Sequence, residues 1–410
     1  MEQNVIHDAV VIGAGIAGLN AAHRLIDGGA DVVVVADTVG GRTVYDKDQR
    51  VNFGTYFVMS NYHNAKRFVT QTQWINPLSC RFFDEGGDSY ATLSTHTLKR
   101  SPGFVAFMAA MTTFIRHYER FKKNCEFMSQ RDAMALEPYI RRLYDQPASA
   151  WIAEHHIGGF AKDYITKFSY ACTGVDAEAI NALDFCNVTH GLVLQMHLFT
   201  FDADAQEKAL DGHFVNDLVV SHQEQDGIHV VLTEGGRDIR ARNVIFAAPA
   251  FDTARLLGLD ASVVRPTSAL YVENIRGTMR PGLDQADMNL FPFSSPVIFT
   301  AKQPAGTFLV YSREPDIDKD RLFTDWELVG RKEWPKAEYV VGNSYIEQQY
   351  GPSTFVAGDH NGLGLEPAAI SGLYAANQVL KTLAARPGAA QATFTPPSSS
   401  FAASATTQES

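Results

Sequence analysis

The sequence has few cysteines and no long hydrophobic run. No two of its four cysteines have CxxC spacing, so neither a dithiol redox centre nor a zinc site is expected. No secretory signal pattern precedes them, and we therefore expect reduced thiols in a cytoplasmic protein. No apolar run reaches the roughly 18 residues that suggest a membrane-spanning helix.

An excess of positive charge is also missing. The chain has 35 lysines and arginines against 46 aspartates and glutamates, which gives a net charge of −11, and no basic stripe is present. A nucleic-acid partner is therefore not expected. The 410 residues, 45% of them hydrophobic, suffice for about two or three globular domains with well-filled cores.

A glycine-rich turn lies near the N-terminus, in "DAVVIGAGIAGLNAAHRLIDGGADVVVV". The pattern predicts a strand, a turn, a helix and a second strand. Gly13 permits the tight turn, Gly15 lets the backbone approach a pyrophosphate, and Gly18 lets the helix lie close to the strand. The free N–H groups at the start of that helix favour an anion. The segment therefore predicts a nucleotide site in an α/β, Rossmann-like domain.

The second strand ends without the acid expected of a ribose ligand, because Ala36 is followed by Asp37. The spacing from Gly13 to Asp37 agrees with the roughly 20 residues typical of that ligand. We favour Asp37 as the ribose-binding residue. The alternative is an aspartate that closes a turn or caps a helix.

Two later segments add to this pattern. Residues 213–250 predict a meander of strands that ends in "VIFAAPA". Residues 354–385 predict a strand, a Gly-Asp turn, a glycine loop and a helix that begins near Pro367, since proline is favoured in a first helical turn. This helix offers a second N-terminus to a ligand.

Together, "GAGIAG" leading to "VGGRT", "NVIFAAPA" and "FVAGDHNGLGLEPAAISGLYAANQVL" resemble the FAD-dependent superfamily of flavin amine oxidases, phytoene desaturases and protoporphyrinogen oxidases. The resemblance implies FAD, which we expect to be non-covalent because no cysteine follows Cys186. It also implies a discontinuous Rossmann-like FAD-binding domain with an inserted helical and β-sheet substrate domain. We assign residues 1–60, 205–262 and 336–388 to the FAD-binding domain, 61–204 and 263–335 to the substrate domain, and 389–410 to a disordered tail.

The resemblance also implies roles for single residues. Gly40, Gly41 and Arg42 belong to a loop under the pyrophosphate and flavin. Asp359 accepts a hydrogen bond from a hydroxyl group on the ribityl or pyrophosphate side. Val219 pairs with the adenine, and the helix near Pro367 points its positive end at the flavin N1/O2 edge. The expected cofactor-binding residues are Gly13, Gly15, Ile16, Ala17, Gly18, Asp37, Gly40, Gly41, Arg42, Thr43, Gly54, Thr55, Tyr56, Val219, Ala248, Gly358, Asp359, Pro367 and Ala368.

Two features depart from the superfamily. The glutamate position falls on Ala36, and the segment from there to "GGR" is shorter by about two residues. Flavin amine oxidases also carry a lysine that holds a water beside flavin N5, but "TSALYVENIRG" contains none. We interpret the nearby Lys302 as a solvated surface residue. This departure argues against plain amine oxidation.

The remaining segments are expected to hold the substrate. Residues 61–204 predict mainly helices, and 263–335 predict strands with Pro-rich turns. We expect the apolar run at 103–115 to be buried; the alternative is an access helix that touches a bilayer. His155 and His156 are neighbours whose side chains point apart, so no metal site is expected.

The sequence therefore predicts an FAD-dependent oxidoreductase that removes a hydride from a hydrophobic small molecule, with C–C desaturation as the favoured reaction. A redox-neutral double-bond isomerase and an amine oxidase are the alternatives among enzymes. A flavin-binding module without catalysis is the alternative outside them. Peripheral membrane contact also stays open.

Overall fold

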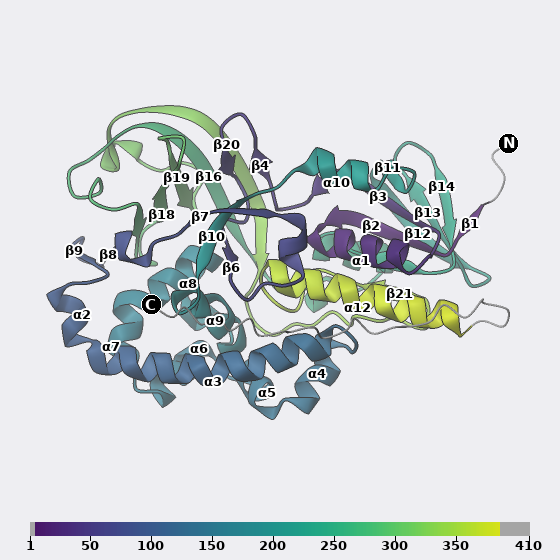
Figure 1. The fold of residues 1–410 in the computed structure, drawn as a ribbon, viewed down its shortest axis with the longest axis horizontal. Coiled ribbons are helices and arrows are strands. Elements are labelled where there is room, and N and C mark those ends of the chain that lie inside the picture. The colour runs from purple at the N-terminus through teal and green to yellow at the C-terminus, as the bar shows by residue number, and fades with distance from the viewer. Residues whose placement is uncertain (1–4, 386–410) are drawn as a thin grey trace, which may run out of the picture.

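The computed structural model describes residues 5–385, so the tail predicted at 389–410 lies outside the described residues. The described chain is elongated (Figure 1), with a parallel sheet and its helices at one end and a larger sheet above a group of helices at the other. Within residues 5–385, no helix is both long and apolar enough to cross a membrane.

A five-stranded parallel sheet carries the glycine turn. Its strand order is β11-β3-β2-β15-β21, and every neighbouring pair is parallel. The strands come from three distant parts of the chain: β2 (Ala9–Gly15), β3 (Val32–Gly40), β11 (Phe214–Asn216), β15 (Val244–Phe246) and β21 (Thr354–Val356). The predicted α/β, Rossmann-like fold is thereby confirmed.

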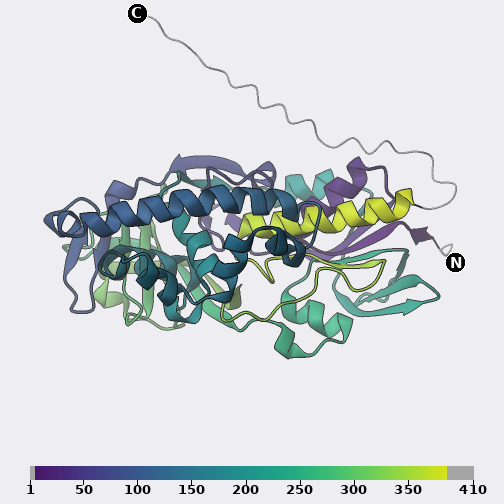
Figure 2. The same ribbon diagram turned by 90° about the horizontal axis from the view of Figure 1, so that it is seen from below.

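Helices α1 (Ile16–Asp27) and α12 (Leu365–Ala384) lie side by side on one face of this sheet (Figures 1 and 2). Their close contact depends on Gly372, because a Cβ at this position would overlap the carbonyl group of Ala17. The other face is covered by α11 (Ala250–Leu257) and by an antiparallel meander. The meander comprises β12 (Val219–Gln225), β13 (Ile228–Thr233) and β14 (Asp238–Ala241), with β1 (Ile6–His7) parallel to β14.

The amino-acid pattern of β3 explains the two-sided burial of the sheet. Val32 and Val34 belong to the apolar cluster under α1 and α12, whereas Val33 and Val35 belong to the cluster under the meander. A run of β-branched residues is typical of a parallel strand with both faces buried.

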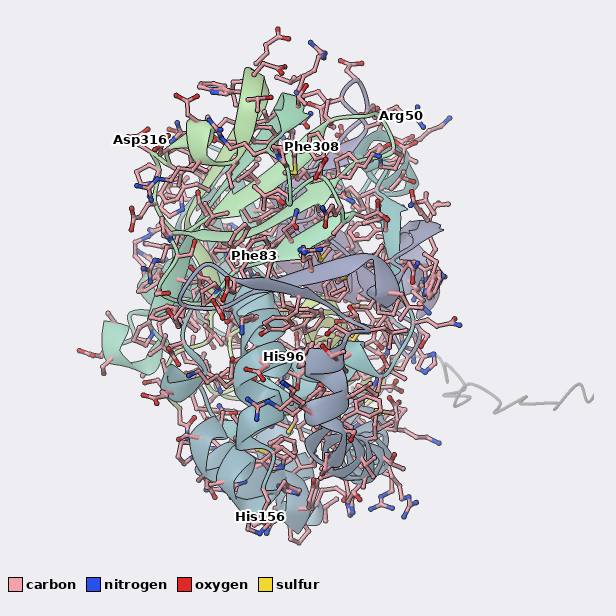
Figure 3. The ribbon with its side chains drawn as sticks, turned by 90° about the vertical axis from the view of Figure 1, so that its left-hand side faces the viewer. Arg50, Phe83, His96, His156, Phe308 and Asp316 are labelled. Atoms are coloured by element: carbon pink, nitrogen blue, oxygen red, sulfur yellow. The ribbon has the colours of Figure 1, made fainter. Side chains whose placement is uncertain are left out.

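A seven-stranded sheet forms the upper part of the other end (Figure 3). Strands predicted in residues 263–335 are present, and two further strands come from the region predicted as mainly helical. In sheet order the strands are β20 (Phe323–Tyr339), β16 (Thr267–Met279), β19 (Phe308–Ser312), β18 (Val297–Lys302), β17 (Met288–Leu290), β8 (Cys80–Phe83) and β9 (Ser89–Ala91).

The prediction for residues 61–204 was therefore incomplete. Strand β8 pairs in parallel with the distant β17, and β7 (Thr70–Trp74) is exposed along its whole length. Neither strand shows the alternating apolar pattern that identifies a strand locally. The short strands outside the two large sheets and the meander are β4 (Tyr45–Asp46), β5 (Val51–Asn52), β6 (Val58–Met59), β7 and β10 (Met196–Thr200).

The longest of the helices below the large sheet is α3 (Ser101–Cys125), which runs along the edge of this group (Figures 1 and 2). Its residues Phe107, Met111 and Phe114 are buried, as expected for the apolar run, whereas Phe104 and Val105 in the first turns are exposed. The other α-helices of the described chain are α2 (Thr95–Lys99), α4 (Gln130–Leu136), α5 (Pro138–Asp145), α6 (Ala148–Glu154), α7 (Gly158–Phe160), α8 (Thr166–Thr173), α9 (Ala182–Thr189) and α10 (Ala203–Ala209).

Candidate cofactor-binding site

The glycine turn between β2 and α1 has the expected shape. Gly13 has a φ of 107°, and a Cβ there would lie 2.6 Å from the carbonyl oxygen of Ala247, which directly follows the neighbouring strand β15. A Cβ on Gly18 would overlap the carbonyl oxygen of Gly13. Gly15 caps α1 without any side-chain hydrogen bond, so the first N–H groups of the helix stay available to an anion. Ile16 and Ala17, in the first turn, are buried.

The second glycine loop lies against the first. Strand β3 continues as far as Gly40, which pairs with Gly15. A Cβ on Gly41, whose φ is 59°, would lie 3.2 Å from the Cα of Gly15. Thr43 is buried and donates its backbone N–H to the carbonyl oxygen of Gly40. Side chains on these glycines would therefore fill the space between the two loops.

Arg42 joins this loop to two distant segments. Its guanidinium donates to Oδ1 of Asp359 at 2.5 Å and to the carbonyl oxygen of Ala337, and it lies 3.9 Å from Oε2 of Glu338. Burial works against the charge on Arg42, but the neighbouring carboxyl groups of Asp359 and Glu338 more than offset it, so its pKa is raised. Burial raises the pKa of Glu338 to about 8, although Arg42 opposes the rise.

The segment Gly54–Tyr56 lies directly against Arg42. A Cβ on Gly54 would overlap the carbonyl oxygen of Arg42, and that oxygen accepts the backbone N–H of Thr55 at 3.1 Å. The ring centroid of Tyr56 is 5.5 Å from that of Phe299 and 6.2 Å from that of Tyr311. This segment, which the sequence predicts to bind the cofactor, therefore also borders an aromatic cluster of the large sheet.

The start of α12 lies close to Asp359. Gly358 has a φ of 147°, Asp359 is buried, and α12 begins at Leu365 after Gly364, which provides no side-chain cap. Pro367 and Ala368 fall in the first turn, as expected from the sequence. The N–H groups of this turn are thus a second set of donors for an anionic or electron-rich group.

Sequence reasoning missed Glu366, which is buried in the same turn. Its carboxylate accepts hydrogen bonds from the backbone N–H groups of His63 and Asn64, and from Ala65 at 2.9 Å. These groups begin the 3-10 helix η1 (Ala65–Phe68). A glutamate in an otherwise apolar first turn was the available signal, but its partners lie about three hundred positions away.

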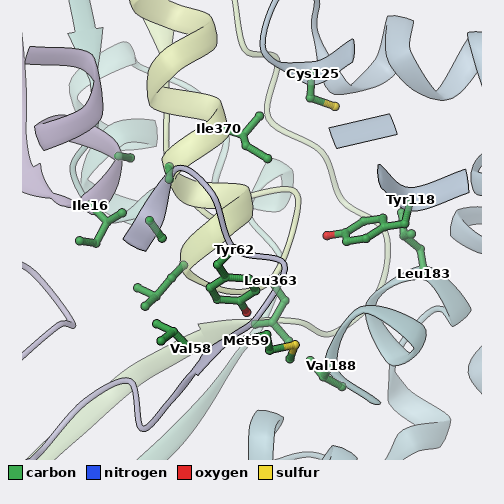
Figure 4. Close-up of a cluster of buried hydrophobic side chains, with 14 of the residues drawn as sticks. Ile16, Val58, Met59, Tyr62, Tyr118, Cys125, Leu183, Val188, Leu363 and Ile370 are labelled. Carbon is green, nitrogen blue, oxygen red and sulfur yellow. The ribbon is translucent and has the colours of Figure 1, made fainter. Parts of the chain in front are cut away.

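Sequence reasoning also missed Glu338, described above beside Arg42, and Tyr62. Tyr62 is buried among apolar residues of several segments, including Met59, Leu363 and Ile370 (Figure 4). Its hydroxyl group lies 3.6 Å from the position of a Cβ on Gly364, so it borders the start of α12. Burial raises the pKa of Tyr62, with smaller contributions from Glu366, Cys172 and Glu338.

The predicted ribose and adenine residues lie near the end of β3. Asp37 is exposed, and Thr38 donates to its carboxylate at 3.4 Å. Ala36 is 7% exposed and belongs to the cluster under α1 and α12. Val219 is buried at the start of β12.

Two other predicted positions can be located. The carbonyl oxygen of Ala248 lies 3.2 Å from Nε2 of His360, close to the glycine turn. Lys302 is exposed at the end of β18, as expected for a surface lysine. Strand β16 contains no lysine.

Comparisons with known proteins agree with this geometry. Residues 11–72 match the model of an NAD(P)-binding Rossmann-like domain. Over 92% of the chain the structure superimposes on a putrescine oxidase variant, of which 99% is covered, with a TM-score of 0.66 and 16% identity. The chain has the flavin amine oxidase fold.

Two more structures share this fold. Cyclohexylamine oxidase from Brevibacterium oxydans matches over 92% of the chain and 98% of its own, with a TM-score of 0.62 and 14% identity. A CLA-producing fatty acid isomerase from P. acnes matches over 90% of the chain and 97% of its own, with a TM-score of 0.59 and 13% identity.

A curated relative extends the comparison to sequence. The probable flavin-containing monoamine oxidase A of Dictyostelium discoideum is 22% identical over 281 residues, which are 60% of this chain and 58% of the relative. The match thus spans less than two thirds of that protein. The comparisons therefore confirm the expected fold, with a Rossmann-like segment at residues 11–72 and the overall architecture of flavin amine oxidases.

Proposed function

We propose that the protein is an FAD-dependent oxidoreductase that removes a hydride from a hydrophobic small molecule, with C–C desaturation as its favoured reaction. The observation that carries the proposal is the contact of Arg42 with Asp359, 2.5 Å apart. This contact joins the loop after β3 to the segment that leads into α12. The loop that packs against the start of α1 is thereby joined to the segment that leads to the start of α12.

The residues present fit a dinucleotide cofactor. The uncapped start of α1 and the Gly15–Gly41 approach suit a diphosphate, because N–H donors are free and no side chain intervenes. Arg42 adds a positive charge, and the start of α12 adds a second group of N–H donors. FAD bound here would supply the hydride acceptor, and the protein would supply orientation and electrostatics.

We propose that the cofactor is bound non-covalently. No cysteine follows Cys186, so the segment that leads into α12 offers no thiol for a covalent link. Acid or heat should release yellow flavin into the supernatant. Flavin that remains with the precipitated protein would contradict this part of the proposal.

The neighbourhood of Tyr56 supports an apolar substrate. Tyr56 packs against a cluster in which Phe299 and Tyr311 are stacked, with centroids 4.3 Å apart. Trp334 also packs against this cluster, and its indole N–H donates to the carbonyl oxygen of Phe53 at 2.6 Å. Phe299 and Tyr311 are themselves buried core residues, so Tyr56 is the aromatic side chain that joins this core to the loop of Arg42. Sites for apolar small molecules are lined mainly by aromatic and hydrophobic side chains. The absence of a lysine from β16 argues against plain amine oxidation.

The two other reactions are distinguished by one experiment. The fold resembles that of a fatty acid isomerase, so redox-neutral double-bond isomerisation is the first alternative. It also resembles that of amine oxidases, so amine oxidation is the second. The purified protein is mixed anaerobically with polyenes, unsaturated fatty acids and amines, and flavin absorbance is followed. Desaturation predicts stable bleaching by an apolar substrate, and isomerisation predicts product without an external acceptor.

Amine oxidation predicts bleaching by an apolar amine, followed by peroxide when oxygen is admitted. A protein that binds FAD but shows neither bleaching nor an isomerised product with any class would be a non-catalytic flavin-binding module. That result would overturn the proposed enzyme while leaving the fold and the cofactor site in place.

Peripheral membrane contact is a further part of the proposal. Leu98 of α2 and Val105 of α3 are 73% and 64% exposed, and Phe104 beside Val105 is 44% exposed. Apolar side chains gathered on one surface are candidates for contact with a membrane. Co-sedimentation with phospholipid vesicles should decrease when both are replaced by glutamate. Equal sedimentation of the variant and the wild type would remove the membrane from the proposal.

A further inference from the structure

Two carboxyl groups share one guanidinium at the cofactor site. Arg42 lies 2.5 Å from Asp359 and 3.9 Å from Glu338. Within residues 5–385, no other cationic side chain lies within 4.0 Å of either carboxyl group. Of the two, Asp359 makes the direct hydrogen bond, and Glu338 lies at the outer limit of an ion pair.

The other titratable groups around Glu338 provide no second positive charge. Cys172 faces it from α8, and Tyr62 faces it from the loop after β6; burial raises the pKa of both, so both are neutral. His360, beside Asp359, has a pKa that burial lowers, so it too is neutral at pH 7. Burial raises the pKa of Glu338 itself, with Arg42 opposing and Asp359 adding to the rise.

Bound FAD would bring two more negative charges, on its diphosphate, to the loops that carry Arg42. One guanidinium would then face Asp359, Glu338 and the diphosphate together. A carboxylate removed from water without a positive partner is costly, and such a group binds a proton instead. The side chain of Glu338 is largely removed from water, with 23% of it exposed. Glu338 is the more weakly paired of the two carboxyl groups, so it is the one that remains protonated.

We propose that Glu338 is a proton-holding residue of the cofactor site, which is a neutral carboxylic acid when FAD is bound while Asp359 stays the charged partner of Arg42. This inference rests on the proposed function. A neutral acid can donate a hydrogen bond. It also avoids the repulsion that a second carboxylate would exert on the negative charge delivered by a hydride.

The proposal has a measurable consequence for binding. At pH 9 the carboxylate of the FAD-free protein is largely ionised, and FAD binding should convert it to the acid by taking one proton from the buffer. The dissociation constant for FAD should then rise with pH, by at most about tenfold per pH unit for one proton. Glu338→Gln keeps the shape of the side chain but cannot take up the proton.

The test is titration calorimetry of the full-length apoprotein with FAD at pH 9, in two buffers of different ionisation enthalpy. On binding FAD, the wild type should take up no more than about one proton per molecule, and Glu338→Gln should take up none. Glu333→Gln, an exposed position of the same strand that pairs with Arg331, is the matched control and should behave as the wild type.

A second variant keeps the proposal testable if Glu338→Gln does not fold. Asp359→Asn removes the competing carboxylate, so Glu338 should pair with Arg42 and the proton uptake should move to lower pH. Uptake that persists in Glu338→Gln, or is missing in the wild type, would overturn the inference. A protein that binds no FAD would instead contradict the proposed function.

Discussion

Glu366, in the first turn of α12, accepts the backbone N–H of Ala65 at 2.9 Å. The same carboxylate accepts the N–H groups of His63 and Asn64. The negative charge of this carboxylate lies in the first turn of α12, where it also interacts with the positive end of that helix. The relationship ties the loop that carries Tyr62 to the helix expected to face the flavin.

The first prediction concerns this contact. Glu366→Ala should lower the free energy of unfolding by about 1.5–3 kcal/mol or more, because buried backbone donors lose a charged acceptor. Urea unfolding of the apoprotein measures it. Glu347→Ala, a half-exposed glutamate paired with Arg131, is the control and should change stability by less than about 1 kcal/mol. Equal losses for both variants would contradict the role of Glu366.

The fold was predictable where local pattern and chain order agree. The valines of β3 and the glycines after β2 identify a Rossmann-like unit without any long-range information. The start of α12 was recognisable for the same reason, since proline in a first turn is a local signal. Strands β7 and β8 were missed because β8 pairs with β17, some two hundred positions away, and β7 is exposed along its length.

The parts of the site that form short sequence motifs were predictable, and the parts that depend on distant partners were not. The glycine loops and Arg42 form short motifs, and the structure brings Arg42 and Asp359 together. Glu338 and Glu366 have no local motif, because what distinguishes each of them is a partner contributed by another segment. Burial of a charged side chain, together with its compensation, depends on tertiary structure.

The second prediction concerns the positive end of α12. Ala368→Asp places a negative charge in its first turn, in addition to the already engaged Glu366, and should disfavour anionic reduced flavin. The midpoint potential should fall by the equivalent of about 0.3–1 kcal/mol, or more if the group is buried. Spectroelectrochemical titration measures it, with Ala368→Asn as the uncharged control. An unchanged potential in the folded, FAD-replete aspartate variant would separate this helix from the flavin.

The third prediction concerns stability in acid. Burial lowers the pKa of His190 and His229 to about 4, well below the ordinary value of 6.5. Between pH 6.5 and 4 the unfolded chain therefore binds protons that the folded protein does not. The free energy of unfolding should be fully retained above pH 6.5 and fall as the pH decreases to 4.

Urea titrations at several pH values measure this loss. His229 lies 2.9 Å from the hydroxyl of Ser353 and 3.0 Å from His222; burial also lowers the pKa of His222. His229→Gln should therefore reduce the slope between pH 6.5 and 4, whereas His156→Gln, on the surface, should not. If the free energy of unfolding of His229→Gln falls with pH as steeply as that of the wild type, His229 does not contribute to the loss of stability in acid.

The last prediction concerns the ribose. The structure leaves the carboxylate of Asp37 exposed, where it accepts a hydrogen bond from Thr38, and buries Ala36 in the cluster under α1 and α12. If Asp37 accepts the adenosine hydroxyls, Asp37→Ala should weaken FAD binding by about 1.5–3 kcal/mol, because charge-assisted hydrogen bonds are lost. Ala36→Glu should not compensate, since its carboxylate would start from a buried position, and it should instead lower stability. Flavin fluorescence on folded apoprotein measures both; equal dissociation constants for Asp37→Ala and the wild type would show that Asp37 does not hold the ribose.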